Sequence, residues 1–516
     1  MSPVIGLPLP PKVTLSRYQE AIIARVRESS TRVIRLVVNA VAGSGKTHTL
    51  KAICREIPSS ANSLFLAFNK HIAETLKSTL PRHVEVKTCH AFGLAAVSAH
   101  LGRVQVNSGK YSQLIYAKTK EIAEGKFTAD SWTMGEMSFQ TIRSTLMSLH
   151  RLGTANLIDF SSTDALDALC AQYGIQLNGN RATIYAAIQA VVADGLRQAQ
   201  TQKVVDFSDM LWLPHVLDIR LPARDWILID ELQDLSRAQR SLAMRATDDH
   251  TNIVGVGDRR QSIQGFAGAD CDSVDNFVAC TDAEELPLSI CYRCPESHIA
   301  LAQEIVPEIE AREDAPEGVI QHLPYSAVST HVRVGDMLIC RTTAPLIKLC
   351  IHLIGRRMPA KVRGRDIANQ LTDIVADVAK VAGFEYRGFQ GTLSDYLSRK
   401  VAKLEGKHDS EQAIEALTDK CDGVRACYES FTDARTVDEL SRAIENLFSD
   451  QDSAIVLSTV HRAKGLEADR VFILCPEKLP LVWKGQRPEQ LAQELNLKYV
   501  SLTRSKETLV FVESER

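Results

Sequence analysis

Short apolar runs rich in valine, isoleucine and leucine recur along the chain between longer segments with helical periodicity. Such runs predict strands buried on both faces of a parallel sheet, because helices then cover both sides. The pattern therefore predicts two α/β units, one in each half of the chain. We expect strands at residues 33–38, 63–68, 84–86, 226–229 and 252–256 in the first unit, and at 336–340, 454–458, 471–475 and 508–512 in the second.

Two long segments interrupt this alternation of strands and helices. Helical patterns at 111–124, 139–150, 163–173 and 182–199 predict a helical insertion in the first unit. A second helical and polar segment predicts a shorter insertion in the second unit. The expected parts are 1–93 with 204–285, the insertion 94–203, 286–366 with 451–516, and the insertion 367–450.

The turn after the first apolar run reads AVAGSGKT at residues 40–47 and leads into a helical pattern. A strand, a small-residue turn and a helix in this order predict a phosphate-binding loop, with Ala40 in place of the usual first glycine. Backbone N–H groups in such a loop converge on phosphate oxygens at the positive end of the helix. Lys46 is placed to reach the β- and γ-phosphates, and the Thr47 hydroxyl to bind Mg²⁺. The other loop residues expected to bind nucleotide are Ala42, Gly43, Ser44 and Gly45.

A second chemical signal lies downstream, where the apolar run 226–229 leads directly into Asp230 and Glu231. Two carboxylates at the end of a buried strand, after a phosphate loop, predict the other half of an ATPase. Asp230 would hold Mg²⁺, directly or through water, and Glu231 would orient and deprotonate the attacking water. The expected cofactors are therefore ATP and Mg²⁺.

Composition changes this picture little. The chain of 516 residues is too long for one core, and its formal charge of -3 means that any surface for nucleic acid must be local. The 12 cysteines show no regular framework, which is typical of a reducing compartment, and we expect Cys291 and Cys294 to be ordinary packed thiols. Residues 1–13 do not resemble a signal peptide, and no apolar run is long enough to cross a membrane. We expect a cytoplasmic protein, nucleoid-associated if bacterial, with no membrane partner.

Nine short motifs, in order along nearly the whole chain, resemble those of superfamily 1A DNA helicases of the UvrD/Rep type. The resemblance implies an α/β fold of two RecA-like parallel-sheet domains, 1A and 2A, with ATP in the cleft between them. It also implies mainly helical insertions, 1B and 2B, where the pattern predicts them. The motifs are that of Gln19, AVAGSGKT, AFNK at 67–70, TCHAF at 88–92, DELQD at 230–234, GDRRQSIQGFAGA from 257, CYR at 291–293, TVHRAKGLE at 459–467 and YVSLTRSK at 499–506.

The resemblance further implies roles for single residues. The amide of Gln19 and the ring of Tyr292 would bind adenine, and Glu467 the ribose. Gln261 and Arg293 would contact the γ-phosphate, and Arg504 would be the arginine finger of domain 2A. Expected contacts to DNA are Asn69, Lys70, Thr88, His90, Phe92, Phe266, Thr459 and His461, whose aromatic members can stack on any base.

Some positions depart from the family pattern. Gln264 and Ala267 replace a tyrosine and an arginine, Phe68 lies one place later than the family's aromatic residue, and insertion 2B is short. The function implied is an ATP-dependent 3′ to 5′ helicase or translocase acting on single-stranded DNA and its junctions with duplex. The short 2B also suits a translocase that strips proteins from DNA but unwinds poorly. The other hypothesis is a DNA-sensing ATPase subunit of a nuclease or defence complex, which would require a protein partner.

Overall fold

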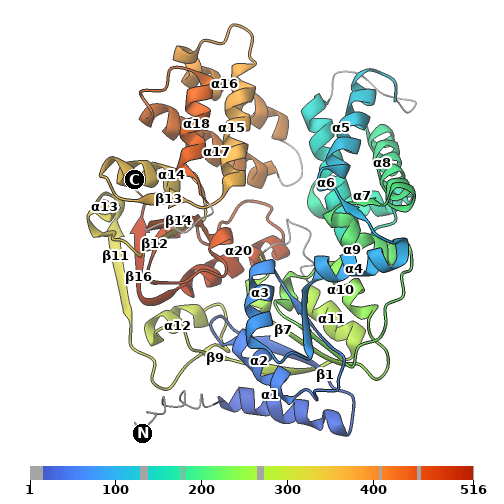
Figure 1. Cartoon of the computed structure of the whole chain (residues 1–516). Helices are drawn as coiled ribbons and strands as arrows, with labels where there is room; N and C mark the ends of the chain where they lie inside the picture. Colours follow the sequence, from blue (N-terminus) through green and yellow to red (C-terminus); the bar gives the residue numbers. More distant parts are fainter. Residues whose placement is uncertain are drawn as a thin grey trace, which may run out of the picture.

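The computed structural model describes residues 15–127, 137–175, 177, 180–263, 272–405, 410–449 and 455–514. Figure 1 shows two sheet-containing bodies in the lower and left-central parts of the molecule, and two helical bodies above them. Each sheet has six strands, all parallel to their neighbours. The prediction of two parallel α/β units is confirmed.

The first sheet has the strand order β3-β2-β6-β7-β1-β8. Apolar side chains cover both of its faces, with α1, α2 and α3 packed on one face and α10 and α11 on the other. The strands are β1 (Arg35–Ala40), β2 (Ser63–Ala67), β3 (Val84–Thr88), β6 (Trp226–Ile229), β7 (Asn252–Gly257) and β8 (Glu284–Leu288). The helices are α1 (Arg17–Arg27), α2 (Lys46–Glu56), α3 (Lys70–Thr79), α10 (Arg237–Met244) and α11 (Ser273–Thr281).

Strand β8 moves one expected domain boundary. It pairs in parallel with β1, from Leu36 beside Glu284 to Ala40 beside Leu288. A boundary between residues 285 and 286 would cut this strand, so the first domain continues through Leu288. The expected boundary at 93/94 also falls inside a helix, α4 (Cys89–Leu101), which runs from the sheet domain into the insertion.

The first insertion is a helical body with its own core. Residues from α4 to α9, including Tyr111, Leu149 and Trp212, form one continuous apolar cluster. The short strands β4 (Gln105–Val106) and β5 (Val204–Val205) pair at its base. The remaining helices are α5 (Lys110–Ala123), α6 (Phe139–Asn156), α7 (Thr163–Tyr173), α8 (Arg181–Gln202) and α9 (Phe207–Val216).

A buried polar cluster holds the base of this insertion together. Lys110 Nζ lies 2.6 Å from Asp209 Oδ2, and both side chains are fully buried. The Tyr111 hydroxyl donates to Asp209 Oδ1 at 2.9 Å, and the His150 ring stacks on Tyr111 with centroids 3.7 Å apart. These contacts join α5, α6 and α9.

The second sheet has the order β11-β16-β15-β12-β14-β13. Its two edge strands were not predicted, because β11 is mostly exposed and β13 is very short. The strands are β11 (Val319–Pro324), β12 (Met337–Cys340), β13 (Ala360–Val362), β14 (Ile455–Thr459), β15 (Ala468–Leu474) and β16 (Ser505–Glu513). The helices around the sheet are α12 (Glu296–Gln303), α13 (Val328–His331), α14 (Ala344–Gly355), α19 (Val460–Ala463) and α20 (Pro488–Leu502). A separate pair of short parallel strands, β9 (Ile290–Cys291) and β10 (Glu310–Ala311), precedes the sheet in the chain.

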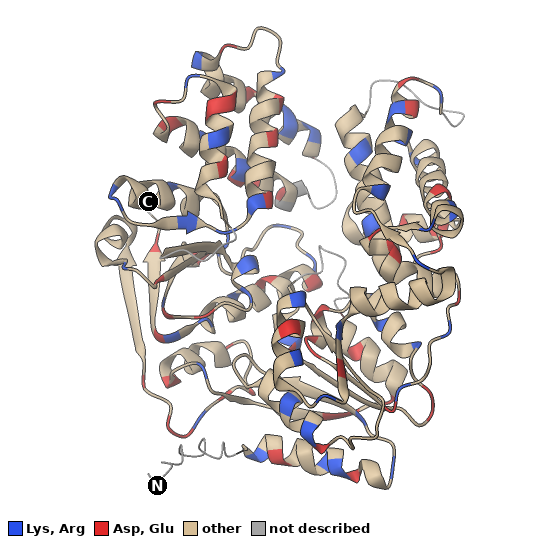
Figure 2. Ribbon diagram, in the orientation of Figure 1, with Lys and Arg blue, Asp and Glu red and all other residues tan. Residues whose placement is uncertain are grey.

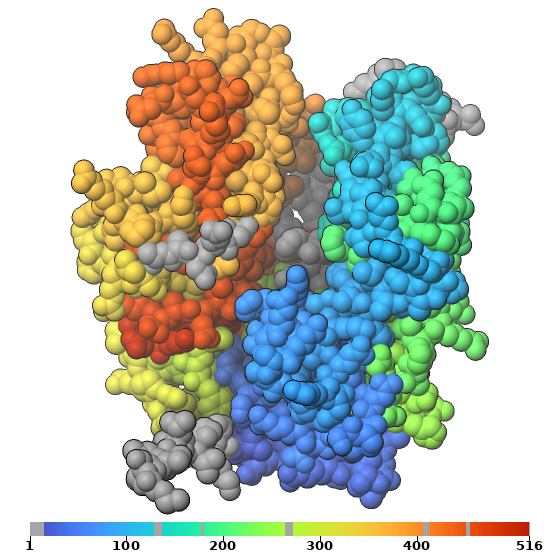
Figure 3. Space-filling view, viewed as in Figure 1, coloured from blue at the N-terminus to red at the C-terminus, as the bar shows by residue number. Residues whose placement is uncertain are grey.

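The second insertion is helical and shares its core with α14 of the sheet domain. It consists of α15 (Arg365–Ala379), α16 (Phe389–Leu404), α17 (Ser410–Ser430) and α18 (Val437–Leu447). In the space-filling view the two insertions face each other across a furrow (Figure 3), and both carry interspersed basic and acidic residues (Figure 2). Within the described ranges, no helix is long and apolar enough to cross a bilayer.

Candidate nucleotide site and nucleic-acid interface

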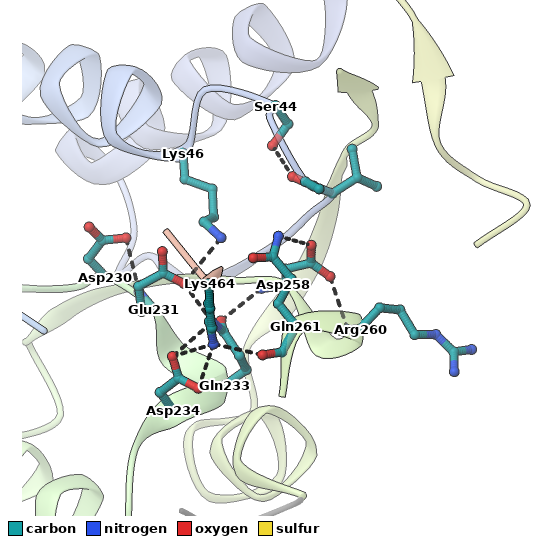
Figure 4. Close-up of polar contacts among 12 residues, drawn as sticks. Ser44, Lys46, Asp230, Glu231, Gln233, Asp234, Asp258, Arg260, Gln261 and Lys464 are labelled. Carbon is teal, nitrogen blue, oxygen red and sulfur yellow. Dashed lines mark hydrogen bonds and ion pairs between the residues drawn. The ribbon is translucent and has the colours of Figure 1, made fainter. Parts of the chain in front are cut away.

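The phosphate loop joins β1 to α2, as predicted, and its shape requires glycine at two positions. Gly45 has φ +82° and caps the N-terminus of α2, and Gly43 has φ +68°. A Cβ on Gly43 would lie 2.8 Å from both Arg293 Cβ and Cys291 Sγ, so any side chain there would collide with the segment that follows β8. The Ser44 hydroxyl donates to the carbonyl of Val41 at 2.8 Å and closes the turn (Figure 4).

The acidic pair lies directly opposite the loop lysine. Strand β6 ends at Ile229, and Glu231 has φ +51°, a backbone conformation that is costly for a residue with a side chain and is often found at functional sites. This turn brings Glu231 Oε2 to 3.1 Å from Lys46 Nζ (Figure 4). Burial opposes ionisation of Glu231, but the charges of Lys46 and Lys464 outweigh it and lower the pKa of Glu231. The carboxylate is therefore ionised.

A hydrogen-bonded network extends from Glu231 to the end of β7. Gln233 Nε2 donates to Glu231 Oε2 at 2.5 Å, and Gln233 Oε1 accepts from the backbone N–H of Asp258 at 2.8 Å. Gln261, in the short helix η3 (Arg259–Gln261), donates through Nε2 to Asp258 Oδ2 at 2.7 Å. The predicted γ-phosphate glutamine and the predicted base thus belong to one network.

The chemistry of this cluster fits a divalent cation. Burial disfavours the charged carboxylate and is the largest cause of the raised pKa of Asp230, Asp234 and Asp258. The positive charges of Lys46 and Lys464 oppose this rise without cancelling it. Hydroxyl and carboxylate oxygens are the ligands that Mg²⁺ prefers. Thr47 at the start of α2 and Asp230 at the end of β6 are the residues that would hold it.

Residues of both domains line one cleft of about 1320 Å³ between the sheets, which we call the nucleotide cleft. In it, Arg293 donates through Nε to Glu467 Oε2 at 2.7 Å. Arg504 is fully buried, and its guanidinium donates to the carbonyls of Val500 and Leu466 and to the Thr503 hydroxyl. The structure brings together these predicted residues in the lining: Gly43, Ser44, Gly45, Lys46, Thr47, Glu231, Gln261, Tyr292, Arg293, Thr459, His461, Glu467 and Arg504.

Gln19 lies beneath the phosphate loop and is only 3% exposed. Its Oε1 accepts from the backbone N–H of Ser16 at 3.0 Å, completing a capping box at the start of α1, and its Nε2 donates to the Thr49 hydroxyl at 3.0 Å. Both ends of the amide are thus used within the chain. The structure shows a residue that fastens α1 to α2, and the adenine contact stays a prediction.

The predicted DNA contacts in the first domain begin two helices at one edge of its sheet. Asn69 accepts from the N–H of Ile72 and caps α3, and Thr88 accepts from the N–H of Ala91 and caps α4. The Lys70 side chain, at the start of α3, is 88% exposed. Helix N-termini and exposed ammonium groups are suited to phosphate.

One of these predictions is corrected. Phe92 is only 5% exposed and packs in the apolar core between the sheet and α10. Because the buried side of α4 faces the sheet, its ring is not available to stack on a base. Phe266, together with Gln264 and Ala267, lies outside the described residues.

Three features were missed from the sequence. Phe68 lines the nucleotide cleft, although its shifted position gave it no assigned role. Phe207 is 54% exposed at the start of α9, edge-on to the His90 ring with centroids 6.1 Å apart. Lys464 bridges the domains, with Nζ at 2.6 Å from Asp234 Oδ2 and 2.7 Å from the Gln261 carbonyl (Figure 4). The signal for Lys464 was its place in the motif TVHRAKGLE, but its partners emerge only from the fold.

A phosphate loop and an acidic pair on one parallel-sheet domain, facing arginines of the other domain across one cleft, define a two-domain nucleoside-triphosphate-binding protein. The family models agree, since the UvrD/REP helicase N-terminal domain matches residues 28–280 and the UvrD-like helicase C-terminal domain matches 392–516. The chain belongs to the UvrD/Rep helicase family, and its two sheets are the RecA-like domains of that family.

Curated relatives carry helicase names. F-box DNA helicase protein 1 of Schizosaccharomyces pombe is 25% identical over 92% of this chain and 55% of its own length. F-box DNA helicase 1 of Gallus gallus is 23% identical over 98% of this chain and 49% of its own length. ATP-dependent DNA helicase PcrA of Staphylococcus aureus is 28% identical over 27% of this chain and 19% of its own length. The chain thus spans about half the length of the two F-box relatives.

Proposed function

We propose that the chain is an ATP-dependent DNA helicase or translocase that moves 3′ to 5′ on single-stranded DNA. The observation that carries this proposal is the placement of Lys46 and Glu231 on one domain, facing Arg293 and Arg504 of the other across the nucleotide cleft. Membership of the UvrD/Rep family supports the same function, and its relatives named as DNA helicases support DNA as the substrate.

The cleft residues divide the work of hydrolysis among themselves. Glu231 orients the attacking water and takes its proton, and Lys46 compensates charge on the β- and γ-phosphates. Arg293 and Arg504 neutralise the charge that spreads over the departing phosphoryl group, for which planar guanidinium groups are well suited. Mg²⁺ held by Thr47 and Asp230 would supply further positive charge to the phosphates.

Two domains that share one nucleotide couple its hydrolysis to movement. Release of phosphate after hydrolysis removes the charge that draws the arginines towards the phosphate loop, so the cleft opens. If the two domains bind single-stranded DNA with unequal affinity, each cycle of cleft closing and opening moves the protein along the strand. The proposed DNA surface consists of the starts of α3 and α4, Lys70, the half-buried ring of His90 and the exposed ring of Phe207.

The test of this function is ATP hydrolysis with and without single-stranded DNA, titrated against salt, with Lys46→Ala as the inactive control. We expect strong stimulation that fades as salt rises, because phosphate contacts release counterions. Normal turnover by Lys46→Ala would refute the nucleotide site. Turnover that does not respond to DNA would refute the motor and favour a partner-dependent DNA-sensing subunit.

Polarity and strand separation need a second assay. Duplexes with a 3′ or a 5′ single-stranded tail are unwound selectively by a motor of fixed direction, and we expect unwinding of the 3′-tailed substrate. A streptavidin block on the 3′-tailed strand separates translocation from unwinding. Displacement of streptavidin without unwinding would favour the translocase, which the short second insertion suits.

A further inference from the structure

The hydroxyl of Tyr499 joins the two domains at the phosphate loop. Tyr499 lies on α20 of the second domain, and its side chain is fully buried. Its ring packs in an apolar cluster with Val41 and Ala42 of the loop and with Cys291 and Cys294. Its hydroxyl accepts a hydrogen bond from the backbone N–H of Ala42 at 2.8 Å. A side chain of one domain therefore satisfies a backbone group in the phosphate loop of the other.

The same hydroxyl also contacts the hydrogen-bonded network that contains Gln261, the predicted γ-phosphate contact. It points its proton towards Asp258 Oδ2 at 3.5 Å, the oxygen that also accepts from Gln261 Nε2 at 2.7 Å. The N–H of Asp258 in turn donates to Gln233, which donates to Glu231. Through Asp258, this hydroxyl connects the loop to both the glutamine and the base.

Burial and the Asp258 carboxylate raise the pKa of the Tyr499 phenol well above its ordinary range. The group therefore keeps its proton throughout the working range of pH, and can accept from Ala42 while donating to Asp258. A phenylalanine would fill the same space but leave the Ala42 N–H buried without this acceptor.

Neighbouring contacts fix α20 against the same segment. Asn496, one turn before Tyr499, donates through Nδ2 to the carbonyl of Ser262 at 3.0 Å. Lys464 binds the carbonyl of Gln261 from another element of the second domain. The hydroxyl can keep its place only while α20 stays docked on η3, so its contacts depend on how the domains are arranged.

We propose that Tyr499 is a positioning residue for hydrolysis. Its hydroxyl, supplied by the second domain, holds the phosphate loop at Ala42 and the Asp258–Gln261 pair of the first domain in the correct positions relative to each other. It acts through these groups and touches no reacting atom. This inference rests on the proposed nucleotide site. It deepens that proposal by naming a route by which docking of the second domain orders the γ-phosphate contacts of the first.

The experiment compares Tyr499→Phe with Tyr185→Phe in the full chain. Tyr185 is a matched control, since it is also buried and donates to a carboxylate, Asp167 Oδ1 at 2.7 Å, but it lies within the first insertion. The readouts are kcat and KM for ATP with saturating single-stranded DNA, the affinity for a fluorescent ADP analogue, and the melting temperature.

For Tyr499→Phe we expect kcat to fall about tenfold, with KM and ADP affinity changed less than about twofold, because hydrogen bonds that orient catalytic groups affect chemistry more than binding. The Tyr185→Phe control should keep the wild-type kcat. A kcat for Tyr499→Phe within twofold of wild type would overturn the proposal. So would a fall in kcat matched by an equal loss of ADP affinity, which would indicate a merely structural role.

A double-mutant cycle with Gln261→Ala gives a second, independent readout. If Tyr499 acts through Gln261, Tyr499→Phe should add little to the loss in kcat that Gln261→Ala already causes. If the fold-losses in kcat of the two single variants instead multiply in the double variant, the proposal is overturned. Lys46→Ala, measured in parallel, separates the two hypotheses: an inactive Lys46→Ala beside a normal Tyr499→Phe refutes the positioning role alone, whereas an active Lys46→Ala refutes the nucleotide site.

Discussion

At the scale of single residues, the turn at Glu231 determines the chemistry of the cleft. Its left-handed backbone aims the carboxylate at Lys46, and two lysines keep it ionised in spite of burial. We expect Glu231→Gln to bind ATP and DNA normally and to hydrolyse ATP at least ~100-fold more slowly, because an amide cannot accept the proton from water. Single-turnover hydrolysis and nucleotide binding measure this directly. Glu20→Gln, an exposed carboxylate on α1, is the control, and loss of ATP binding by Glu231→Gln would contradict a role as base.

Arg504 is held so firmly that alanine is a poor probe of its role. Alanine would remove the donor to the Leu466 carbonyl and open a cavity in place of the buried guanidinium, which donates to three acceptors. Lysine keeps the positive charge but lacks the planar fork. We expect Arg504→Lys to lose about 10³-fold in kcat with nearly normal nucleotide affinity, the usual effect of removing an arginine finger. Unchanged turnover in a rapid-quench assay would exclude that role.

At the scale of elements, burial explains what the sequence could and could not predict. Strand β6 and helix α7 were predicted to the residue, because aspartates flank the apolar strand on both sides and Ser162 and Gly174 cap the helix. Edge strand β11 was missed because most of its side chains face solvent, so no apolar run marks it. The wrong prediction for Phe92 has the opposite cause, since a motif position does not reveal which side of α4 is buried.

For the site, too, motifs within one stretch of sequence could be predicted, whereas contacts between distant residues could not. The phosphate loop and the acidic pair were predictable, because each is a contiguous stretch with its own chemistry. The bridge between Lys464 and Asp234 and the Tyr499 contact to Ala42 join residues hundreds of positions apart. No local pattern reports such pairs.

The base of the first insertion should respond to pH through His150. Burial, and then the charge of Lys110, lower its pKa to about 3. The unfolded chain takes up a proton below the ordinary pKa of 6.5 and the folded insertion does not, so this contribution to stability is present above pH 6.5 and is lost as pH falls. We expect His150 to contribute a loss of about 2 kcal/mol in the opening free energy of α6 between pH 7 and pH 5. Asp209 of the same cluster, whose pKa burial raises to about 6, offsets part of this loss in both wild type and variant.

Amide hydrogen exchange of α6, corrected for intrinsic rates, measures that loss. In His150→Phe, which retains stacking on Tyr111, the loss should disappear, whereas replacing the exposed His100 with glutamine should not change it. An identical pH response in wild type and His150→Phe would show that another group is responsible.

At the scale of the whole molecule, a net charge of -3 leaves DNA affinity to local groups such as Lys70. We expect Lys70→Ala to weaken single-stranded DNA binding and to reduce the slope of log affinity against log salt by about 0.7, the effect of one lost phosphate contact. Fluorescence anisotropy at several salt concentrations measures the slope. Lys77→Ala, two turns later on α3 and also exposed, is the matched control, and equal slopes for both variants would remove Lys70 from the DNA path.

The strand order of the first sheet also has a consequence for biosynthesis. The strand that leads into the phosphate loop, β1, pairs only with β7 and β8, and both are translated after the entire first insertion. A nascent chain therefore carries its nucleotide-binding sequence for most of the first domain's synthesis without the neighbours that complete it, and such distant pairings form slowly. A ribosome-stalled chain that ends before residue 252 should be unable to retain ATP. Chaperones that hold apolar strands would then find β1 accessible until Leu288 emerges.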